Sequence, residues 1–332
     1  MPLDQTTESL HYRVCGLILA SDSPLQDLAP LALADSSTIA DLRLRMAVSR
    51  REFPAPSNWI MSWKLPTGEL WLSCSKEEQG YLLRFHDTAD FFVDKQGREL
   101  LCRAEPGTPP HTLHHLILNQ ALPLVINLRG QEALHATAVL TPWGVCAFTG
   151  PTGTGKSTLA AGFLSAGYPV LSDDCLVLQE RDGRILAVPA YPELRLWEDS
   201  FDALYHGRRN SLPVAHYSSK RRVTFEEHPA DFPTAPQPLT RIYILPERSV
   251  AGNPEGGAMP ALERIAGRES FMALLTSLFR LDVTDGAMLT RQFHFLDRLL
   301  SLVPVRRLRI PSAFSALSAT RETILTDLQS SG

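Results

Sequence analysis

The chain has 332 residues, of which 44% are hydrophobic and 20% charged, and its formal net charge is -4. This length allows two folding units of the usual size, roughly 100 to 200 residues each, and the composition is that of a soluble globular protein. A slightly acidic chain is not attracted to nucleic acid, so we exclude DNA and RNA as main partners. No segment reaches the roughly 18 apolar residues of a membrane span, and we expect a cytoplasmic protein without a membrane partner. The five cysteines are far apart, which predicts neither disulfides nor a zinc site.

Residues 1–107 are predicted to form a smaller β-rich domain. Short apolar segments alternate there with turn residues such as those in "PTGE" and "KQG", a pattern typical of successive strands. The stretch "AEPGTPP", residues 104–110, stops both helix and strand because its prolines and glycine restrict or loosen the backbone. We therefore place a domain boundary there and assign residues 108–332 to a second, α/β domain.

The second domain is predicted to begin with a buried amphipathic helix over residues 111–129. Two strands, 132–140 and 145–149, follow it, and then a helix over 156–166 that Gly167 stops. The later elements are predicted from the same periodicities. They are strands within 168–180, the first of which ends at residue 172, further strands at 185–189, 239–247 and 303–311, helices at 267–281 and 291–303, and a loop at 249–260.

A phosphate-binding loop is predicted in "GPTGTGKST", which fits G-x-x-x-x-G-K-[ST] between an apolar strand and a helix. Its glycines let consecutive backbone N–H groups turn toward a phosphate at a helix N-terminus. Lys156 would reach the β- and γ-phosphates and Ser157 would bind Mg²⁺. We predict ATP and Mg²⁺ as cofactors, with GTP left open. The nucleotide-binding residues would be Gly150, Pro151, Thr152, Gly153, Thr154, Gly155, Lys156, Ser157 and Thr158.

Two adjacent carboxylates end a predicted strand 17 residues after Lys156. They are Asp173 and Asp174, and the interval is long enough for one helix and one returning strand. Because successive strand residues point to opposite faces, both can reach the loop only where the strand ends or bulges. One carboxylate is expected to bind the metal and the other to act as a base on an acceptor hydroxyl. His135 lies 21 residues before Lys156, where a histidine taken alone is more typical of a packed core.

The densest basic cluster is Lys220-Arg221-Arg222. Lys220 or Arg221 is a candidate to close over the nucleotide, because a cation that meets the oxygens of a transferring phosphoryl group stabilises it. A solvated basic turn is the alternative interpretation.

Residues 134–178 resemble the catalytic domain of HPr kinase/phosphorylase, the bacterial enzyme that phosphorylates a serine of a small phosphocarrier protein. The resemblance rests on His135, the loop at Lys156 and the Asp173-Asp174 pair at that family's own spacings. It implies a P-loop kinase domain of the HPr kinase/PEP carboxykinase-like type. It also implies that Asp173, next to His135, is the general base and that Asp174 binds the metal with Ser157, although the two aspartates could exchange roles.

The segment "YPELRLWED" departs from that family, because only Glu193 and Arg195 match its Glu-x-Arg segment. Glu193 is a candidate second metal ligand, with a solvated strand end as the alternative, and the phosphorolytic reverse reaction is not expected. The layout of the whole chain resembles the HPr-kinase-like serine kinases of lasso-peptide and other modified-peptide gene clusters. This implies a kinase that phosphorylates a serine of a peptide and could form homo-oligomers. A carrier protein such as HPr, a small-molecule hydroxyl, and a nucleotide-binding adaptor without transfer are the alternatives.

Overall fold

The computed structural model describes residues 9–35, 37–65, 67–205, 211–224, 232–247 and 259–330. It has a mixed α/β fold with large sheets and several helices, in agreement with the predicted fold class at this level. The chain divides into two compact units. The first unit is Met1–Gly130 with Arg280–Gly286, and the second is Gln131–Phe279 with Ala287–Gly332. Most of the predicted loop 249–260 lies outside the described residues.

An eight-stranded sheet forms most of the first unit. Its strands run in the order β1-β2-β3-β8-β7-β6-β5-β4, and β3 is parallel to both of its neighbours whereas the other pairs are antiparallel. The strands are β1 (Leu10–Val14), β2 (Leu17–Ser21), β3 (Leu42–Met46), β4 (Trp59–Lys64), β5 (Leu70–Glu77), β6 (Gly80–Phe85), β7 (Ala89–Asp94) and β8 (Glu99–Ala104), with short 3-10 turns at Gln26–Leu31 and Arg50–Glu52.

The helix predicted over residues 111–129 is interrupted by a π-helical turn. Helix α1 (Pro110–Leu116) is followed by the π turn at Ile117–Ala121 and by α2 (Leu122–Leu128). Pro123 explains the interruption, because proline lacks an N–H and its ring clashes with the carbonyl four residues earlier, and a wider turn relieves both problems.

This helical segment belongs to the first compact unit, and the division between the two units lies at Gly130. Arg129 donates a hydrogen bond to the backbone oxygen of Asp41 at 3.0 Å and pairs with its carboxylate at 3.1 Å. Gly97 allows a close approach as well, because a Cβ atom there would lie 2.9 Å from the backbone oxygen of Val125. These contacts attach the helical segment to the sheet.

A buried carboxylate holds residues Arg280–Gly286 in the first unit. Asp282 is 1% exposed and accepts hydrogen bonds from Lys76 Nζ at 2.8 Å, Tyr81 Oη at 2.8 Å and Thr284 Oγ1 at 2.6 Å. Such a pairing across distant segments has no signature in the sequence pattern.

The second unit contains a mixed sheet whose main path is β12-β10-β11-β18-β14-β13-β9, with β20 parallel to β18 and β19 beyond it. A separate three-stranded sheet has the order β15-β17-β16. The strands are β9 (Glu132–Leu134), β10 (Ala136–Thr141), β11 (Gly144–Thr149), β12 (Val170–Ser172), β13 (Leu176–Arg181), β14 (Arg184–Val188), β15 (Glu193–Trp197), β16 (Leu212–Pro213), β17 (Lys220–Thr224), β18 (Gln237–Ile244), β19 (Ala261–Arg264) and β20 (Val305–Arg309).

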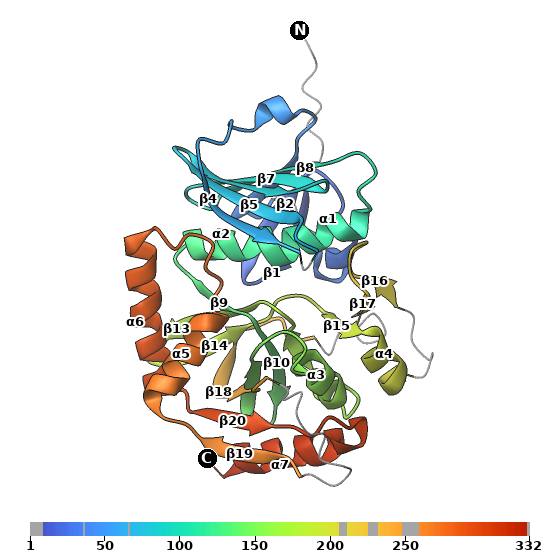
Figure 1. Ribbon diagram of the computed structural model, residues 1–332, viewed down its shortest axis with the longest axis vertical. Coiled ribbons are helices and arrows are strands. Elements are labelled where there is room, and N and C mark those ends of the chain that lie inside the picture. The colour runs from blue at the N-terminus through green and yellow to red at the C-terminus, as the bar shows by residue number, and fades with distance from the viewer. Residues whose placement is uncertain are drawn as a thin grey trace. The chain divides into compact units, whose positions relative to one another are not determined.

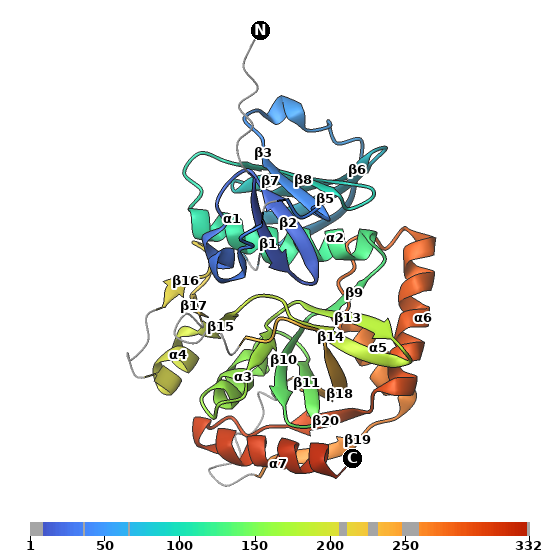
Figure 2. The ribbon, with the colours of Figure 1, turned by 180° about the vertical axis from the view of Figure 1, so that it is seen from behind.

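Helices cover both faces of this sheet (Figures 1 and 2). Helices α3 (Lys156–Leu164), α4 (Glu198–Tyr205) and α7 (Leu317–Gln329) share one apolar core with Val139 and Phe148. Helices α5 (Gly267–Ser277) and α6 (Gly286–Leu302) share the other with Ala138 and Ala147. The strand period of two thus sends alternate residues into different cores. Helix α7 was not predicted, and no helix among the described residues is long and apolar enough to cross a membrane.

The variant Asp282→Asn is expected to lower the free energy of unfolding at neutral pH by about 2 kcal/mol, because it removes the charge that Lys76 and Tyr81 contact. Burial opposes ionisation of Asp282, but hydrogen bonds from Lys76, Thr284 and Tyr81 lower its pKa to about 2. A carboxyl with a lowered folded pKa stabilises above its unfolded pKa of about 3.9 and loses this effect as the pH falls through the folded value.

Urea unfolding between about pH 7 and about pH 2 tests this, since the wild type should lose stability below about pH 4 and the variant should lose less. Asp285→Asn is the control, because Asp285 also pairs with Lys76, at 3.1 Å, but is 30% exposed. Equal losses in both variants would contradict the role given to Asp282.

Candidate active site

The predicted phosphate loop connects β11 to α3, and its backbone shape depends on glycine. Gly150, Gly153 and Gly155 have φ angles of 144°, 85° and 100°, a region that other residues rarely adopt. At Gly150 there is also no room for a side chain, because a Cβ atom would lie 2.2 Å from the backbone oxygen of Leu245. The first glycine of the motif is therefore required by two independent constraints.

Lys156 is folded back into this loop. It is 6% exposed, and its Nζ donates hydrogen bonds to the backbone oxygens of Gly150 at 2.8 Å and Pro151 at 3.1 Å. Burial lowers the pKa of Lys156, and the charges of Asp174 and Asp173 oppose that shift. A phosphate in the loop would supply the negative charge that this buried ammonium favours.

Asp173 is a buried carboxylate held from three sides. Its Oδ1 accepts hydrogen bonds from Thr137 Oγ1 at 2.6 Å and Ser157 Oγ at 2.9 Å, and its Oδ2 accepts one from the backbone N–H of Arg195 at 2.8 Å. Burial and the neighbouring charge of Asp174 raise the pKa of Asp173, with Arg195 acting in the opposite direction. Asp173 does not line the cavity described below.

Asp174 points the other way. It has a φ of 68°, a left-handed turn just after β12 ends at Ser172, and it lines the cavity. Its Oδ2 accepts a hydrogen bond from Arg195 Nη1 at 3.1 Å, and its Oδ1 lies 3.8 Å from His135 Nε2. Burial would raise the pKa of Asp174, but Arg195 and then Lys220 lower it below its ordinary value. The strand end predicted from the sequence thus gives the two aspartates different surroundings.

Glu193 is engaged elsewhere. Its Oε1 accepts a hydrogen bond from Arg195 Nε at 3.0 Å, and its Oε2 lies 3.7 Å from Arg222 Nη1. Arg195 also donates to the hydroxyl of Tyr191, and it is almost fully buried. Arg195 therefore links Glu193 to Asp174, while Glu193 itself does not line the cavity.

The two predicted basic residues lie on opposite sides of β17. Lys220 lines the cavity and its Nζ lies 5.3 Å from the ring centre of Trp197. Arg221 instead donates a hydrogen bond to Ser211 Oγ at 2.9 Å and lies 3.8 Å from Glu198. Alternation along the strand separates them, so of the two only Lys220 lines the cavity.

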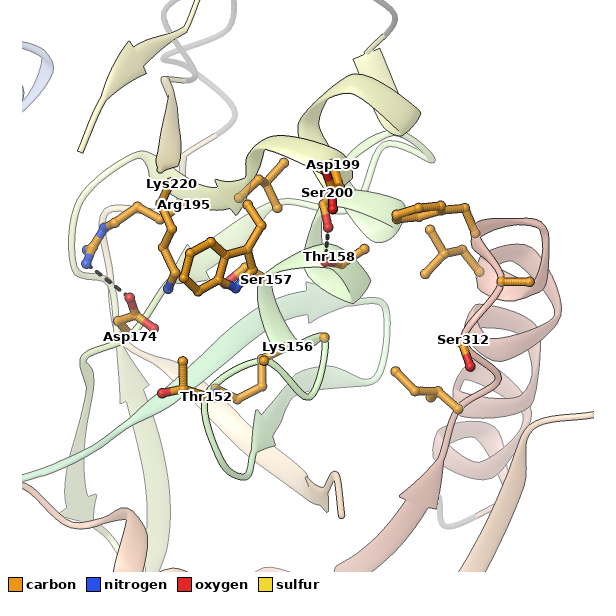
Figure 3. A pocket seen from close by; sticks show the side chains of 18 of the residues that line it. Thr152, Lys156, Ser157, Thr158, Asp174, Arg195, Asp199, Ser200, Lys220 and Ser312 are labelled. Carbon is orange, nitrogen blue, oxygen red and sulfur yellow. Dashed lines mark hydrogen bonds and ion pairs between the residues drawn. The ribbon is translucent and has the colours of Figure 1, made fainter. Parts of the chain in front are cut away.

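Of the groups described above, Lys156, Asp174, Arg195 and Lys220 line a cavity of about 330 Å³ in the second unit. In Figure 3, Asp174, Arg195 and Lys220 lie on one side of Ser157, and Ser312 lies on the other. The lining also includes Thr152, Gly153, Gly155, Thr158 and His135, all predicted as site residues. Gly150, Pro151 and Thr154 belong to the loop but do not line the cavity. Thr154 Oγ1 donates a hydrogen bond to the backbone oxygen of Pro151 at 2.9 Å within the loop.

The donor set suits Mg²⁺. Within the described residues no group of three His, Cys, Asp or Glu side chains is placed to hold a metal ion. Mg²⁺, however, usually takes one or two carboxylates together with waters and substrate phosphates. Ser157 and Asp173 offer a ligand set of this kind, a hydroxyl that donates a hydrogen bond to a carboxylate oxygen at 2.9 Å.

Several residues of the site were not predicted. Thr137 could have been found, because it lies two residues from His135 in the predicted strand 132–140, where alternate residues share a face. Ser277 could not have been found, because it comes from the distant helix α5. Its hydroxyl accepts a hydrogen bond from Thr149 Oγ1 at 2.6 Å, and its backbone oxygen accepts one from the N–H of His135 at 2.6 Å. Other cavity-lining residues without a signal are Trp197, Asp199, Ser200 and residues 310–314 and 317.

Comparison of the sequence with protein-family models and with curated proteins finds no match. Among solved structures, the chain is similar to the Hpr(Ser) kinase/phosphatase from Coxiella burnetii, with a TM-score of 0.31 and 11% sequence identity, over 60% of this chain and 99% of that chain. A similarity of this size is no evidence about activity. The chemistry of the site rests on the residues of this chain.

The variant Gly150→Ala is expected to destabilise the second unit by about 3 kcal/mol, because its methyl group meets the backbone oxygen of Leu245. Gly153→Ala is the matched control, since Gly153 also has a positive φ but nothing lies within 4 Å of its Cβ position. The control should lose only about 1 kcal/mol from backbone strain. Chemical unfolding of both variants measures the difference, and equal losses would show that the approach of Leu245 does not constrain the loop.

Proposed function

We propose that the chain is an ATP- and Mg²⁺-dependent serine kinase that transfers the γ-phosphoryl group to a serine hydroxyl of a peptide. One observation carries the proposal: a single cavity is lined by the phosphate loop and by the carboxylate of Asp174, whose lowered pKa keeps it ionised. A protein that only binds a nucleotide needs a group on the metal side, which Ser157 and Asp173 would supply here, but no further carboxylate such as Asp174 in the cavity. The arrangement therefore favours transfer over binding alone.

The donor half of the proposed site consists of the loop, Lys156, Ser157 and Asp173. Backbone N–H groups of the loop and the ammonium of Lys156 would bind the phosphates. Ser157 would bind Mg²⁺, with Asp173 fixing its hydroxyl from behind through the hydrogen bond at 2.9 Å. Bound Mg²⁺ would neutralise charge that develops on the phosphate oxygens.

The acceptor half consists of Asp174, His135 and Lys220. Asp174 would accept a hydrogen bond from the serine hydroxyl and take its proton as the serine oxygen bonds to phosphorus and the bond from phosphorus to the ADP oxygen breaks. His135, at 3.8 Å, would help orient the carboxylate, and Lys220 would meet the phosphoryl oxygens. This proposal exchanges the roles that the resemblance implied for Asp173 and Asp174, because Asp173 is buried and Asp174 lines the cavity.

The acceptor is proposed as a peptide on the strength of the resemblance to kinases of modified-peptide clusters. A carrier protein such as HPr and a small-molecule hydroxyl remain alternatives. The deciding assay incubates the protein with ATP, Mg²⁺ and peptides ending in serine, next to the same peptides with alanine, and looks for the mass of one added phosphate. Phosphorylation of the serine peptide alone supports the proposal, whereas nucleotide binding without any phosphorylated acceptor favours the adaptor.

In that assay Asp174→Asn should lower kcat by about 100-fold or more while leaving the affinity for ATP nearly unchanged, because it removes the proton acceptor. Asp173→Asn should instead weaken the dependence of binding on Mg²⁺, and Lys156→Ala should weaken binding itself. Asp182→Asn is the matched control. It makes the same change at another aspartate with a positive φ, 52°, whose side chain is 92% exposed on the turn between β13 and β14. A loss of ATP affinity in Asp174→Asn would return Asp174 to the role of metal ligand.

A further inference from the structure

The cavity changes in character from one end to the other. Around Asp174 its lining is charged, with Arg195 and Lys220 near by, and at the opposite end the lining is apolar. Figure 3 shows the charged group on one side of Ser157 and the segment of Ser312 on the other. The apolar end is formed mainly by residues that follow β20, namely Ile310, Pro311, Ala313, Phe314 and Leu317.

Phe314 stands out in this segment. Phe314 lines the cavity and is 41% exposed, so an aromatic side chain in this lining is accessible to a ligand. Aromatic side chains of this kind bind nucleobases by stacking, which works for any base because every base has a π face. A nucleoside triphosphate matches the two ends of the cavity, because it has charged phosphates at one end and an aromatic base at the other.

The position of this segment is set by the same helix that begins at the phosphate loop. Leu317 packs against α3, where a Cβ atom on Gly162 would lie 3.6 Å from that of Leu317. Arg321 of α7 donates a hydrogen bond to the backbone oxygen of Gly162 at 3.2 Å. The loop at the start of α3 and the turn of Phe314 before α7 are therefore joined to two helices that pack against each other.

Polar side chains lie between the two ends. Thr158 Oγ1 donates a hydrogen bond to Ser200 Oγ at 3.1 Å, and Asp199 lines the cavity next to them. A carboxylate at this point would repel a phosphate but accept hydrogen bonds from sugar hydroxyls, as acidic residues do in dinucleotide sites. A nucleotide bound here would have its phosphates toward Lys156 and Lys220 and its sugar toward Asp199.

From these observations we infer that residues 310–317 form a base-binding subsite, in which the aromatic base of a nucleoside triphosphate stacks on Phe314 and its ribose contacts Asp199. The inference rests on the proposed function, because it assumes that the loop binds the phosphates. It assigns a role to a segment that no sequence motif marks, more than 150 residues after the loop.

The test compares ATP with inorganic tripolyphosphate, which has the phosphates but no base. Both affinities are measured by calorimetry with Mg²⁺ for the wild type, Phe314→Ala, Phe314→Tyr and Phe293→Ala. Phe293 is the matched control, an exposed phenylalanine of α6 that packs on Phe271 and does not line the cavity. Phe314→Ala should weaken ATP binding by about 10-fold and leave tripolyphosphate binding unchanged. Phe314→Tyr should retain the affinity for ATP, and Phe293→Ala should change neither affinity.

The outcomes separate this inference from the proposed function. If Phe314→Ala leaves ATP binding unchanged, or weakens ATP and tripolyphosphate equally, the subsite is overturned while the phosphate loop stands. If the wild type binds neither ligand, both proposals fail. If Phe314→Ala affects ATP alone but no acceptor is ever phosphorylated, the subsite stands and the proposed transfer fails.

Discussion

The candidate site depends on the buried carboxylate of Asp173. A carboxylate removed from water is costly unless hydrogen bonds replace its hydration. Here those bonds come from Thr137 on β10, Ser157 at the start of α3 and the backbone of Arg195 on β15. Three segments that are distant in the sequence must therefore meet at one point. The phosphate loop, which ends at Ser157, takes its place relative to the sheet from this meeting.

A second constraint makes two identical neighbours chemically different. The left-handed turn at Asp174 directs its side chain toward the cavity, whereas Asp173 stays buried. Arg195 serves both, since its backbone donates to Asp173 and its guanidinium to Asp174. Opposite pKa shifts follow, because burial dominates at Asp173 and neighbouring cations dominate at Asp174. Under the proposed function, Asp173 would serve as the metal-side carboxylate and Asp174 as the ionised acceptor-side carboxylate.

Local patterns predicted much of the second unit. The strand before the loop, the helix after it and the return strand that ends at the aspartates all follow from short-range periodicity and from Gly167. Contacts and side-chain directions that depend on segments distant in the sequence were predicted less well. The helical segment and Arg129 contact the first sheet at Asp41 and Gly97, and these contacts cannot be seen in the segment's own residues. Lys220 and Arg221 could not be distinguished either, since the face of a strand is known only once its partner is known.

The sequence by itself determined the shape of the glycine-rich loop at residues 150–157 and its spacing from the two aspartates, because the φ preferences of glycine act within a few residues of chain. Only the tertiary structure decided which aspartate faces the cavity, that Glu193 pairs with Arg195, and that residues 310–317 complete the cavity opposite Asp174. The physical reason is the range of the interactions. Backbone preferences act over a few residues, whereas burial and charge pairing depend on every segment that packs around a group.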